Sequence, residues 1–474
     1  MNRSKTAQRI CITTTMIAII STTITACDRQ ETIAYFNHID TTESNLQTVT
    51  QVPEEDLAED NSPGKPSGQQ GTTDESDAES AQETNKADTT PQSSQAEGTN
   101  HTDAAQKPSE IKETDKTENN VENGDTSEYK GKEVSLIMVG DILLHTPVAE
   151  SGVQEDGRYN FDAIFSNVKD DIEAADLALV NEEVIIGGEE LGVSGYPSFN
   201  APYELGDALV DAGFDVVLHA TNHTLDQGKR GVQNCLSFWK QQYPEIAVLG
   251  INESQDAQDD QIYVYEQDGI RIAILNYTYG TNGIALPADM PYVVNLLDEE
   301  KVTADLAKAQ ELADFVVVCP HWGTEYQLAP DAKQKYWTKL FLENGVDLVI
   351  GTHPHVIEPV EWVTDEKGNE MLVYYSIGNF VNWTASFGEG IANRMVGGMA
   401  QITVGMDNGE AFIVDYDVTP LVCHVSEGIN GVTVYRLSDY TDALAAENAI
   451  VQQDGAFSKE YCEELCGEVW GELR

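Results

Sequence analysis

The chain has 474 residues, of which 41% are hydrophobic and 8% aromatic, so it holds enough apolar material for a large folded core. Its 81 acidic residues against 27 basic ones give a formal net charge of -54, which argues against nucleic acid as a partner, because nucleic acids are bound by basic surfaces. Charge alone does not distinguish an acidic surface that aids solubility from one that repels a polyanionic product.

The N-terminus has the pattern of an export signal. Basic Arg3, Lys5 and Arg9 precede an apolar run at 10–24, which is short for a membrane-spanning helix. The run ends in "ITAC", which resembles a bacterial lipobox, and this predicts that residues 1–27 are a lipoprotein signal peptide with Cys27 lipidated as the first mature residue. The alternative is an ordinary signal peptide or an uncleaved anchor. Either way the chain is expected outside the cytoplasm, and the lipobox predicts a lipid-anchored protein on the outer face of the cell membrane.

Residues 28–130 differ sharply in composition from the rest of the chain. They are rich in Thr, Ser, Glu, Asp, Gln and Asn, with scattered Pro and few aromatic residues. Such a segment cannot bury enough apolar surface to offset the conformational entropy lost on folding. We therefore expect a disordered acidic linker that tethers the folded part to the membrane.

From about residue 131 onward the chain alternates between short apolar runs and amphipathic segments. The amphipathic segments include "PYELGDALVDAGF" at 202–214 and "DAKQKYWTKLFLENG" at 331–345. Apolar strand-like runs that alternate with amphipathic helices are typical of βα units around a buried sheet. The sequence therefore predicts an α/β fold over 131–425.

The strand candidates share one feature, a polar side chain at the C-terminal end. The runs are "VSLIMVGD", "ADLALVNEE", "FDVVLHATNH", "ADFVVVCPHW" and "VDLVIGTHPH". In an open α/β sheet, ligands gather outside the carboxyl ends of the strands, so these side chains can converge on one site. Each motif alone has an ordinary structural explanation, such as a turn or a satisfied polar corner, but five at the same end of five strands favour a shared site. The converging residues are Asp141, Glu183, Asn222, His223, His321, His353 and His355.

The side-chain types at this site favour divalent metal ions. Imidazole and carboxylate ligands suit first-row divalent ions, and the lack of cysteine at the strand ends argues against a structural zinc site. Seven groups are too many for one ion. Two ions about 3.5–4 Å apart that share a bridging carboxylate would use them, and such a pair activates water and clamps a phosphoryl-like centre.

The motifs "MVGDILL", "NEE", "ATNHTLDQG", "HWGTEY", "GTHPHV" and "YSIGNF", in this order, resemble the CapA family of poly-γ-glutamate capsule biosynthesis, a distant branch of the calcineurin-like metallophosphatases. The resemblance covers about 133–425 and implies a layered α/β sandwich of the metallophosphatase type with its site at the strand ends. It implies that Glu183 bridges two divalent ions of unknown identity (Mn, Zn, Fe or Mg). One ion would be bound by Asp141, Glu183 and His355, and the other by Glu183, Asn222, His321 and His353.

The resemblance also implies two catalytic residues. His223 corresponds to the histidine that protonates a leaving group, and Asp226 would orient it. The sequence departs from the metallophosphatase pattern in that His145 lies four residues after Asp141, which favours a rim position for His145 over a ligand role. "NEE" replaces the usual "NLE" and adds Glu182, whose side chain would point away from Glu183 if strand alternation holds.

The same alternation predicts that His353 and His355, at positions i and i+2, project together into the site with Pro354 stiffening the turn between them. Two flanking features have a structural interpretation. Asn379 in "YSIGNF" is expected to support the site rather than take part in its chemistry. Residues 426–474 are expected to form a C-terminal helical extension.

Two functions from different classes fit these observations. The first is a lipid-anchored, metal-dependent hydrolase or transferase that acts on an envelope polymer or its phosphate-linked precursor. The second is a non-catalytic accessory subunit of a polyglutamate synthesis or export complex, with synthase subunits as its partners. The complete set of ligand-type residues favours the first, because a decayed accessory domain is expected to have lost some of them.

Overall fold

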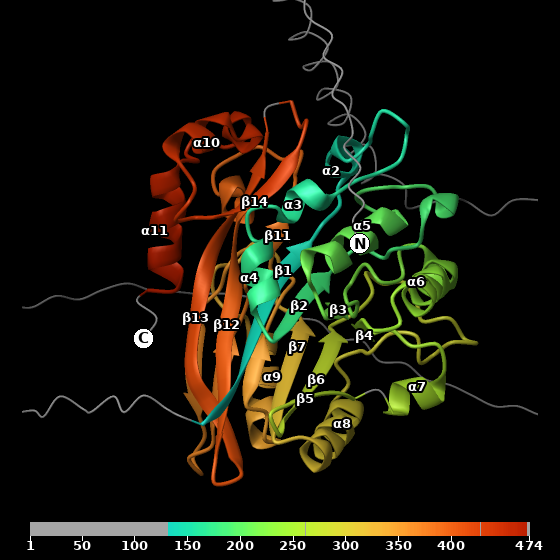
Figure 1. Cartoon of the computed structure of the whole chain (residues 1–474), viewed down its shortest axis with the longest axis vertical. Coiled ribbons are helices and arrows are strands. Elements are labelled where there is room, and N and C mark those ends of the chain that lie inside the picture. The colour runs from blue at the N-terminus through green and yellow to red at the C-terminus, as the bar shows by residue number, and fades with distance from the viewer. Residues whose placement is uncertain (1–130, 261, 427, 472–474) are drawn as a thin grey trace, which may run out of the picture. The chain divides into compact units, whose positions relative to one another are not determined.

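The structure, a computed structural model, describes residues 131–471 except 261 and 427 (Figure 1). The signal peptide and lipidation site predicted at 1–27 and the linker predicted at 28–130 lie outside the described residues. Two mixed β-sheets form the centre of the described part. In the described residues, no helix has both the length and the apolar character needed to cross a membrane.

The first sheet has eight strands, and its central part is parallel. Its strands lie in the order β14-β13-β12-β1-β2-β3-β4, and β11 pairs with β1. Strands β1 to β4 and β11 form parallel pairs with one another, whereas β12 pairs antiparallel with β1, β13 with β12, and β14 with β13. The strands are β1 (Lys132–Ile142), β2 (Leu177–Glu182), β3 (Val216–Leu218), β4 (Ala247–Leu249), β11 (Asn379–Val381), β12 (Val396–Asp407), β13 (Glu410–Val425) and β14 (Val432–Arg436).

The second sheet has six strands in the order β5-β6-β7-β8-β10-β9. Strands β6, β7, β8 and β10 are parallel, and the two edge strands pair antiparallel. The parallel strands of both sheets therefore present their carboxyl ends as rows of loops that can carry a site. The strands are β5 (Tyr263–Gln267), β6 (Ile270–Thr278), β7 (Phe315–His321), β8 (Leu348–Ile350), β9 (Val360–Thr364) and β10 (Glu370–Tyr374).

Four helices connect the parallel strands, and two of them begin at a side-chain cap. Asp298 caps the first turn of one, and Asp331 and Gln334 form a reciprocal capping box at another, so the first backbone N–H groups have partners. The connecting helices are α5 (Tyr203–Ala212), α6 (Gly228–Gln242), α8 (Glu299–Leu312) and α9 (Ala332–Glu343). The other helices are α2 (Thr146–Ser151), α3 (Asp162–Phe165), α4 (Lys169–Ala174), α7 (Gln255–Asp260), α10 (Asp442–Glu447) and α11 (Lys459–Val469), with 3₁₀ turns η2 (Glu189–Leu191), η3 (Ile391–Met395) and η4 (Ala449–Gln452).

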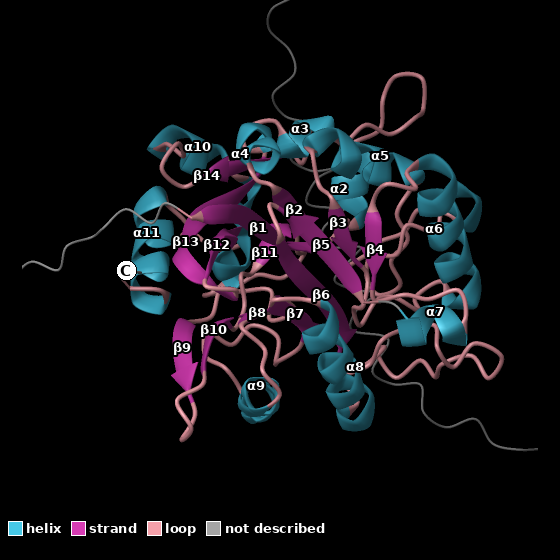
Figure 2. Cartoon of the chain, turned by 60° about the horizontal axis from the view of Figure 1, so that its bottom comes forward, coloured by secondary structure: helices cyan, strands magenta, loops and turns pink. Residues whose placement is uncertain are grey.

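The two sheets pack face to face with helices on their outer sides (Figure 2). The alternation in β6 shows how: Ile272 and Ile274 join the large core that includes both sheets, whereas Ala273 and Leu275 join a smaller core with residues of α8 and α9. Successive residues of a strand point to opposite faces, so each central strand of this sheet needs apolar residues on both sides. The predicted layered α/β sandwich is confirmed.

The segment after residue 425 differs from the expected helical extension. It begins with β14, which pairs with β13 and makes this segment part of the first sheet. Helices α10 and α11 follow, and the indole of Trp470 at the end of α11 donates a hydrogen bond to the Glu358 carbonyl, at 3.0 Å. The alternating apolar residues of "VTVYR" are the local signal for this strand, because its alternate residues Val432 and Val434 are buried.

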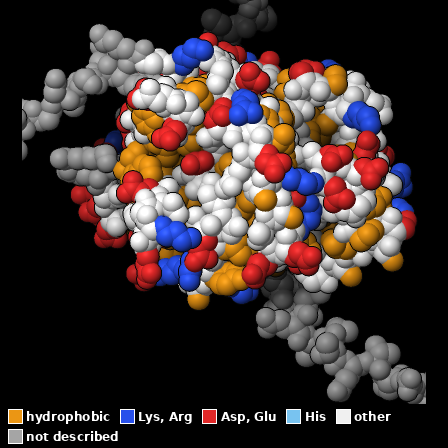
Figure 3. Space-filling view, turned by 90° about the horizontal axis from the view of Figure 1, so that it is seen from below, with side chains coloured by type: hydrophobic (Ala, Val, Ile, Leu, Met, Phe, Trp, Pro, Cys, Tyr) orange, Lys and Arg blue, Asp and Glu red, His pale blue; other side chains and the backbone are white. Residues whose placement is uncertain are grey.

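Acidic and basic side chains are mixed over the face seen from below (Figure 3). The five cysteines of the described residues are all free and buried, where each packs as a small apolar side chain.

Candidate metal centre

Five strand ends from the two sheets meet at one buried site, as the sequence predicted. Asp141 lies near the end of β1 and Glu183 directly follows β2, while Asn222 and His223 follow β3. From the second sheet, His321 ends β7, and His353 and His355 follow β8. Each of these seven residues is at most 6% exposed, although most carry a charge or can acquire one. Polar groups buried this deeply need strong partners.

Each of the six expected metal ligands lies close to at least one other. Nδ1 of His355 is 3.2 Å from Oδ2 of Asp141, and Nε2 of His321 is 3.5 Å from Oε1 of Glu183. Nε2 of His321 also lies 2.8 Å from Oδ1 of Asn222. The ring centroids of His321 and His353 are 4.8 Å apart. The structure therefore brings together residues that lie far apart in the sequence, on strands of both sheets.

Two overlapping groups of side chains have the spacing of metal ligands. In each group, one ligand atom from every member lies within 4.8 Å of the others. Glu183 belongs to both, in agreement with a bridging position. The groups are Glu183 with His353 and His355, and Asp141 with Glu183 and His321. This division differs from the one implied by the resemblance, which placed His355 with Asp141 and His321 with His353.

Unsatisfied polar atoms at the site fit bound cations. Neither carboxylate oxygen of Glu183 has a hydrogen-bond partner among the described residues, and the same holds for Nδ1 of His353. Buried polar atoms without a partner are uncommon in folded proteins, because each costs free energy. Carboxylate oxygens and neutral imidazole nitrogens are the ligands that catalytic divalent ions use, so the residues present fit a metal centre.

The electrostatics of the histidines support this assignment. Burial lowers the pKa of His353 well below its usual value, and the charges of His321 and His355 lower it further. His353 is therefore neutral, the form that binds metals. Burial alone would also lower the pKa of His355, but the carboxylates of Glu183 and Asp141 raise it to about 9. Two carboxylates at this site thus stabilise a positive charge between them.

Three neutral side chains hold the ligands in position. Nδ2 of Asn181 donates to Oδ1 of Asp141 at 2.8 Å, and Oγ1 of Thr352 lies 3.0 Å from Nδ1 of His321. Oδ1 of Asn379 lies 3.1 Å from Nδ1 of His355, and its Nδ2 donates to the His355 carbonyl at 2.9 Å. Such partners orient metal ligands. Asn379 has the supporting contacts expected of it, whereas sequence reasoning missed Asn181 and Thr352, although they lie inside the quoted motifs.

His223 and Asp226 form a buried pair beside the ligands. Nδ1 of His223 lies 2.7 Å from Oδ2 of Asp226, and the two side chains are only 7% and 3% exposed. The same carboxylate oxygen accepts a hydrogen bond from the Phe199 backbone N–H at 2.7 Å, and the Phe199 ring packs edge-on against the imidazole. Asn282, which sequence reasoning missed, bridges the pair to Asn222 through contacts of 3.4 and 3.2 Å. The pair is thus fixed from three sides.

The expected strand geometry of the "THPH" segment is wrong. Strand β8 ends at Ile350, and His353 and His355 have φ angles of 97° and 58°, in the left-handed region that non-glycine residues rarely adopt. Both side chains still reach the site, but through two left-handed residues instead of strand alternation. Asn282 and Tyr326, which also border the site, have φ angles of 51° and 65°. Each such residue costs on the order of 1–3 kcal/mol, and residues of this kind cluster at functional sites.

His145 and Glu182, the two departures from the expected pattern, contribute no ligand to either group. His145 is half-buried, with its ring 5.1 Å from that of Phe199. Burial, together with the charges of His355 and His223, lowers its pKa to about 3. Burial raises the pKa of Glu182 well above its usual value, so this side chain is a neutral acid inside the core.

The sequence profile of the bacterial capsule synthesis protein family PGA_cap matches residues 135–384, which contain every residue of the site. The chain belongs to this family. The PGA biosynthesis protein CapA of Bacillus subtilis (strain 168) is 29% identical over 266 residues, which are 54% of this chain and 66% of that protein. The capsule biosynthesis protein CapA of Bacillus anthracis is 27% identical over 309 residues, which are 63% of this chain and 69% of that protein.

Several solved structures resemble the chain with low TM-scores and low sequence identity. The 5′-nucleotidase precursor from Thermus thermophilus has a TM-score of 0.38 and 17% identity, over 61% of this chain and 54% of that one. The calcineurin-like phosphoesterase YfkN from Bacillus subtilis has a TM-score of 0.36 and 12% identity, over 70% of this chain and 100% of that one.

Proposed function

We propose that this PGA_cap family protein is a metal-dependent hydrolase or transferase that cleaves or forms a phosphoester in a capsule polymer or its precursor. The observation that supports this most is the pair of overlapping ligand groups that share Glu183, whose carboxylate is buried and lacks a hydrogen-bond partner among the described residues. A shared carboxylate between two ions is the arrangement used for displacement at phosphorus. Asp141, Glu183, Asn222, His321, His353 and His355 would hold two divalent ions.

The chain's own residues would orient the substrate and move a proton. When bound, the ions would supply Lewis acidity and an activated water. Nδ1 of His223 donates to the Asp226 carboxylate at 2.7 Å, so the other ring nitrogen, Nε2, is the atom that exchanges a proton with the leaving group. The carboxylate of Asp226 stabilises the protonated imidazole and fixes the tautomer of the neutral one. The edge-on Phe199 ring excludes water from one side of the imidazole.

A second function, that of a non-catalytic subunit in a synthesis or export complex, is favoured by the names of the two CapA relatives, which refer to biosynthesis and not to hydrolysis. In that case the same fold would bind an envelope polymer or synthase subunits. The buried and unsatisfied ligand atoms favour the enzyme, because a purely structural role gains nothing from their cost.

Metal content and turnover of the purified full chain test the first function. We expect up to two divalent ions per chain and metal-dependent hydrolysis of bis(p-nitrophenyl) phosphate, lost on chelation and restored by added metal. Replacement of the shared ligand, Glu183→Gln, is expected to lower the content of both ions. A wild-type chain that binds no divalent ion at micromolar concentrations would refute the enzyme and leave the accessory subunit.

We also propose that the protein acts on the outer face of the cell membrane, held by lipid on Cys27. The "ITAC" pattern at residues 24–27 supports this proposal. Separately, the strong negative charge of the chain argues against nucleic acid as a partner. Two lipid chains on one cysteine give stable anchoring. Cys27→Ser is expected to move the protein out of the membrane fraction, and unchanged fractionation of this variant would count against lipidation.

A further inference from the structure

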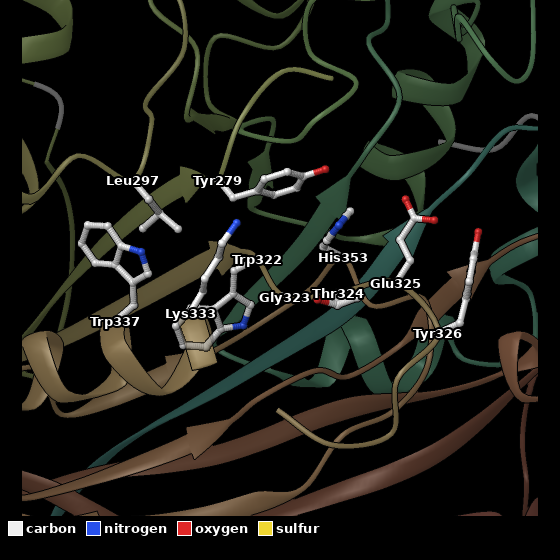
Figure 4. A pocket seen from close by; sticks show the side chains of 10 residues that line it. All are labelled: Tyr279, Leu297, Trp322, Gly323, Thr324, Glu325, Tyr326, Lys333, Trp337 and His353. Carbon is white, nitrogen blue, oxygen red and sulfur yellow. The ribbon is translucent and has the colours of Figure 1, made fainter. Parts of the chain in front are cut away.

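A pocket of about 360 Å³ adjoins the candidate metal centre at His353 (Figure 4). Pockets of this size hold small ligands or segments of larger ones. The proposed function assigns no role to this pocket, since His353 is the one metal ligand that lines it. Besides His353, its walls include Tyr279, Trp322, Glu325, Tyr326, Lys333 and Trp337.

The aromatic side chains that line the pocket include the buried Trp322 and the partly exposed Tyr279 and Tyr326. Trp322 is 1% exposed and its indole N–H donates to the Tyr375 carbonyl at 2.9 Å, so this wall is fixed. Tyr279 and Tyr326 are 42% and 46% exposed, and the ring of Tyr279 lies 4.6 Å from that of His353. Large aromatic rings left half in solvent beside a metal ligand offer apolar surface to a bound molecule.

The position of Tyr326 is held at a cost. Its backbone has a φ of 65°, and its N–H donates to the Pro354 carbonyl at 2.7 Å, which links it to the turn that carries both histidines. The guanidinium of Arg394 lies 3.5 Å from the centroid of the Tyr326 ring, and that ring lies 6.0 Å from the ring of His355. A strained residue kept in place by a cation–π contact fits a wall that must be rigid when a ligand binds.

The pocket carries one cation and one carboxylate. Lys333 lies in the first turn of α9, where the Asp331–Gln334 capping box fixes the backbone. Its ammonium group has no carboxylate oxygen within 4.0 Å in the described part of the chain, although acidic residues outnumber basic ones threefold in the sequence. In Figure 4, Lys333 and Glu325 lie on either side of His353. The pocket therefore offers a partner for an anion and, across the metal ligand, an acceptor for a hydrogen-bond donor.

We propose that this pocket binds the substrate segment next to the reacting group, a linear chain whose anionic substituent pairs with Lys333 while an amide or hydroxyl group donates to Glu325. The chemistry common to the candidate substrates is a single anionic group, a carboxylate or a phosphate, that pairs with Lys333. The assignment of the bound chain as substrate rests on the proposed function, but binding by the pocket does not.

Binding to the chelator-treated full chain tests the pocket without the metal centre. The probes are tri-γ-glutamate for carboxylates, tripolyphosphate for phosphates and trialanine amide as an uncharged control, titrated by calorimetry at low salt. Lys333→Ala is expected to weaken binding of one of the anionic probes about two- to fivefold, as for a partly exposed ion pair, and Lys333→Glu to weaken it further. Lys335→Ala and Lys335→Glu, which change an exposed charge on the same helix, are the matched controls.

The probe that binds more tightly identifies the anion. A loss of affinity in the Lys333 variants but not in the Lys335 variants supports the pocket. Equal affinities in the Lys333 and Lys335 variants, or no binding of either anionic probe to the wild type, would overturn it. The outcome is separable from the proposed function, because a wild type that binds the probe through Lys333 but binds no divalent ion at micromolar concentrations would refute the enzyme and keep the pocket.

Discussion

The contact between His223 and Asp226 gives the sharpest prediction about the chemistry. If His223 transfers the proton, His223→Ala is expected to lower kcat for bis(p-nitrophenyl) phosphate by about 10²–10⁴-fold, the usual contribution of a positioned acid or base. Its metal content is expected to stay unchanged, because His223 belongs to neither ligand group. Loss of metal together with activity would show that His223 acts as a ligand instead.

Asp226→Asn separates the positioning role from the proton transfer. The 2.7 Å contact is a hydrogen bond to a charged group, worth roughly 1.5–3 kcal/mol, so its loss is expected to lower kcat roughly 10- to 150-fold. Asparagine can still accept the Phe199 N–H, so the thermal midpoint of unfolding is expected to change little.

The double variant decides whether the two residues act as one unit. Asp226 is expected to act only through His223, so adding Asp226→Asn to His223→Ala should cause no further loss of kcat. The assay is steady-state hydrolysis with metal content measured on the same samples. A double variant much slower than His223→Ala would refute the assigned roles, because Asp226 would then contribute on its own.

Three further variants test the structure around the site. His353→Ala is expected to lower the content to at most one ion per chain by mass spectrometry, since Asp141, Glu183 and His321 keep one ligand group intact; an unchanged content would exclude His353 as a ligand. Asn379→Ala is expected to weaken metal binding about 10- to 100-fold in a competition titration, because it releases His355, and wild-type affinity would show that this support is not needed. Burial raises the pKa of Glu358 to about 8 from 4.5, so the folded chain holds a proton that the unfolded chain releases, and stability falls as the pH rises from 4.5 to 8. Glu358→Gln is expected to remove this loss, about 3 kcal/mol at pH 7, in urea unfolding at pH 5 and pH 8, and a parallel pH dependence in both proteins would contradict it.

Much of the site could be predicted because a parallel sheet imposes a simple rule. Residues at the carboxyl ends of buried strands meet at one edge, so apolar runs that end in Asp141, Glu183, Asn222 and His321 already predicted which side chains would converge. The types of those side chains indicated metal binding. Local sequence also predicted the helices within 202–214 and 331–345, because amphipathic periodicity depends on neighbouring residues.

Only the tertiary structure decided the geometry within the site. Local sequence does not favour the left-handed backbone of His353 and His355, because this conformation costs energy. It persists because packing between residues far apart in the sequence outweighs that cost. The membership of His321 in the group of Asp141 and the position of Asn282 beside His223 depend on how the two sheets pack. The same packing brings Tyr279 and Lys333 to one pocket beside His353. Sequence determined which groups reach the strand ends, whereas long-range packing determined which of them face each other, because strand periodicity is local and distances between sheets are not.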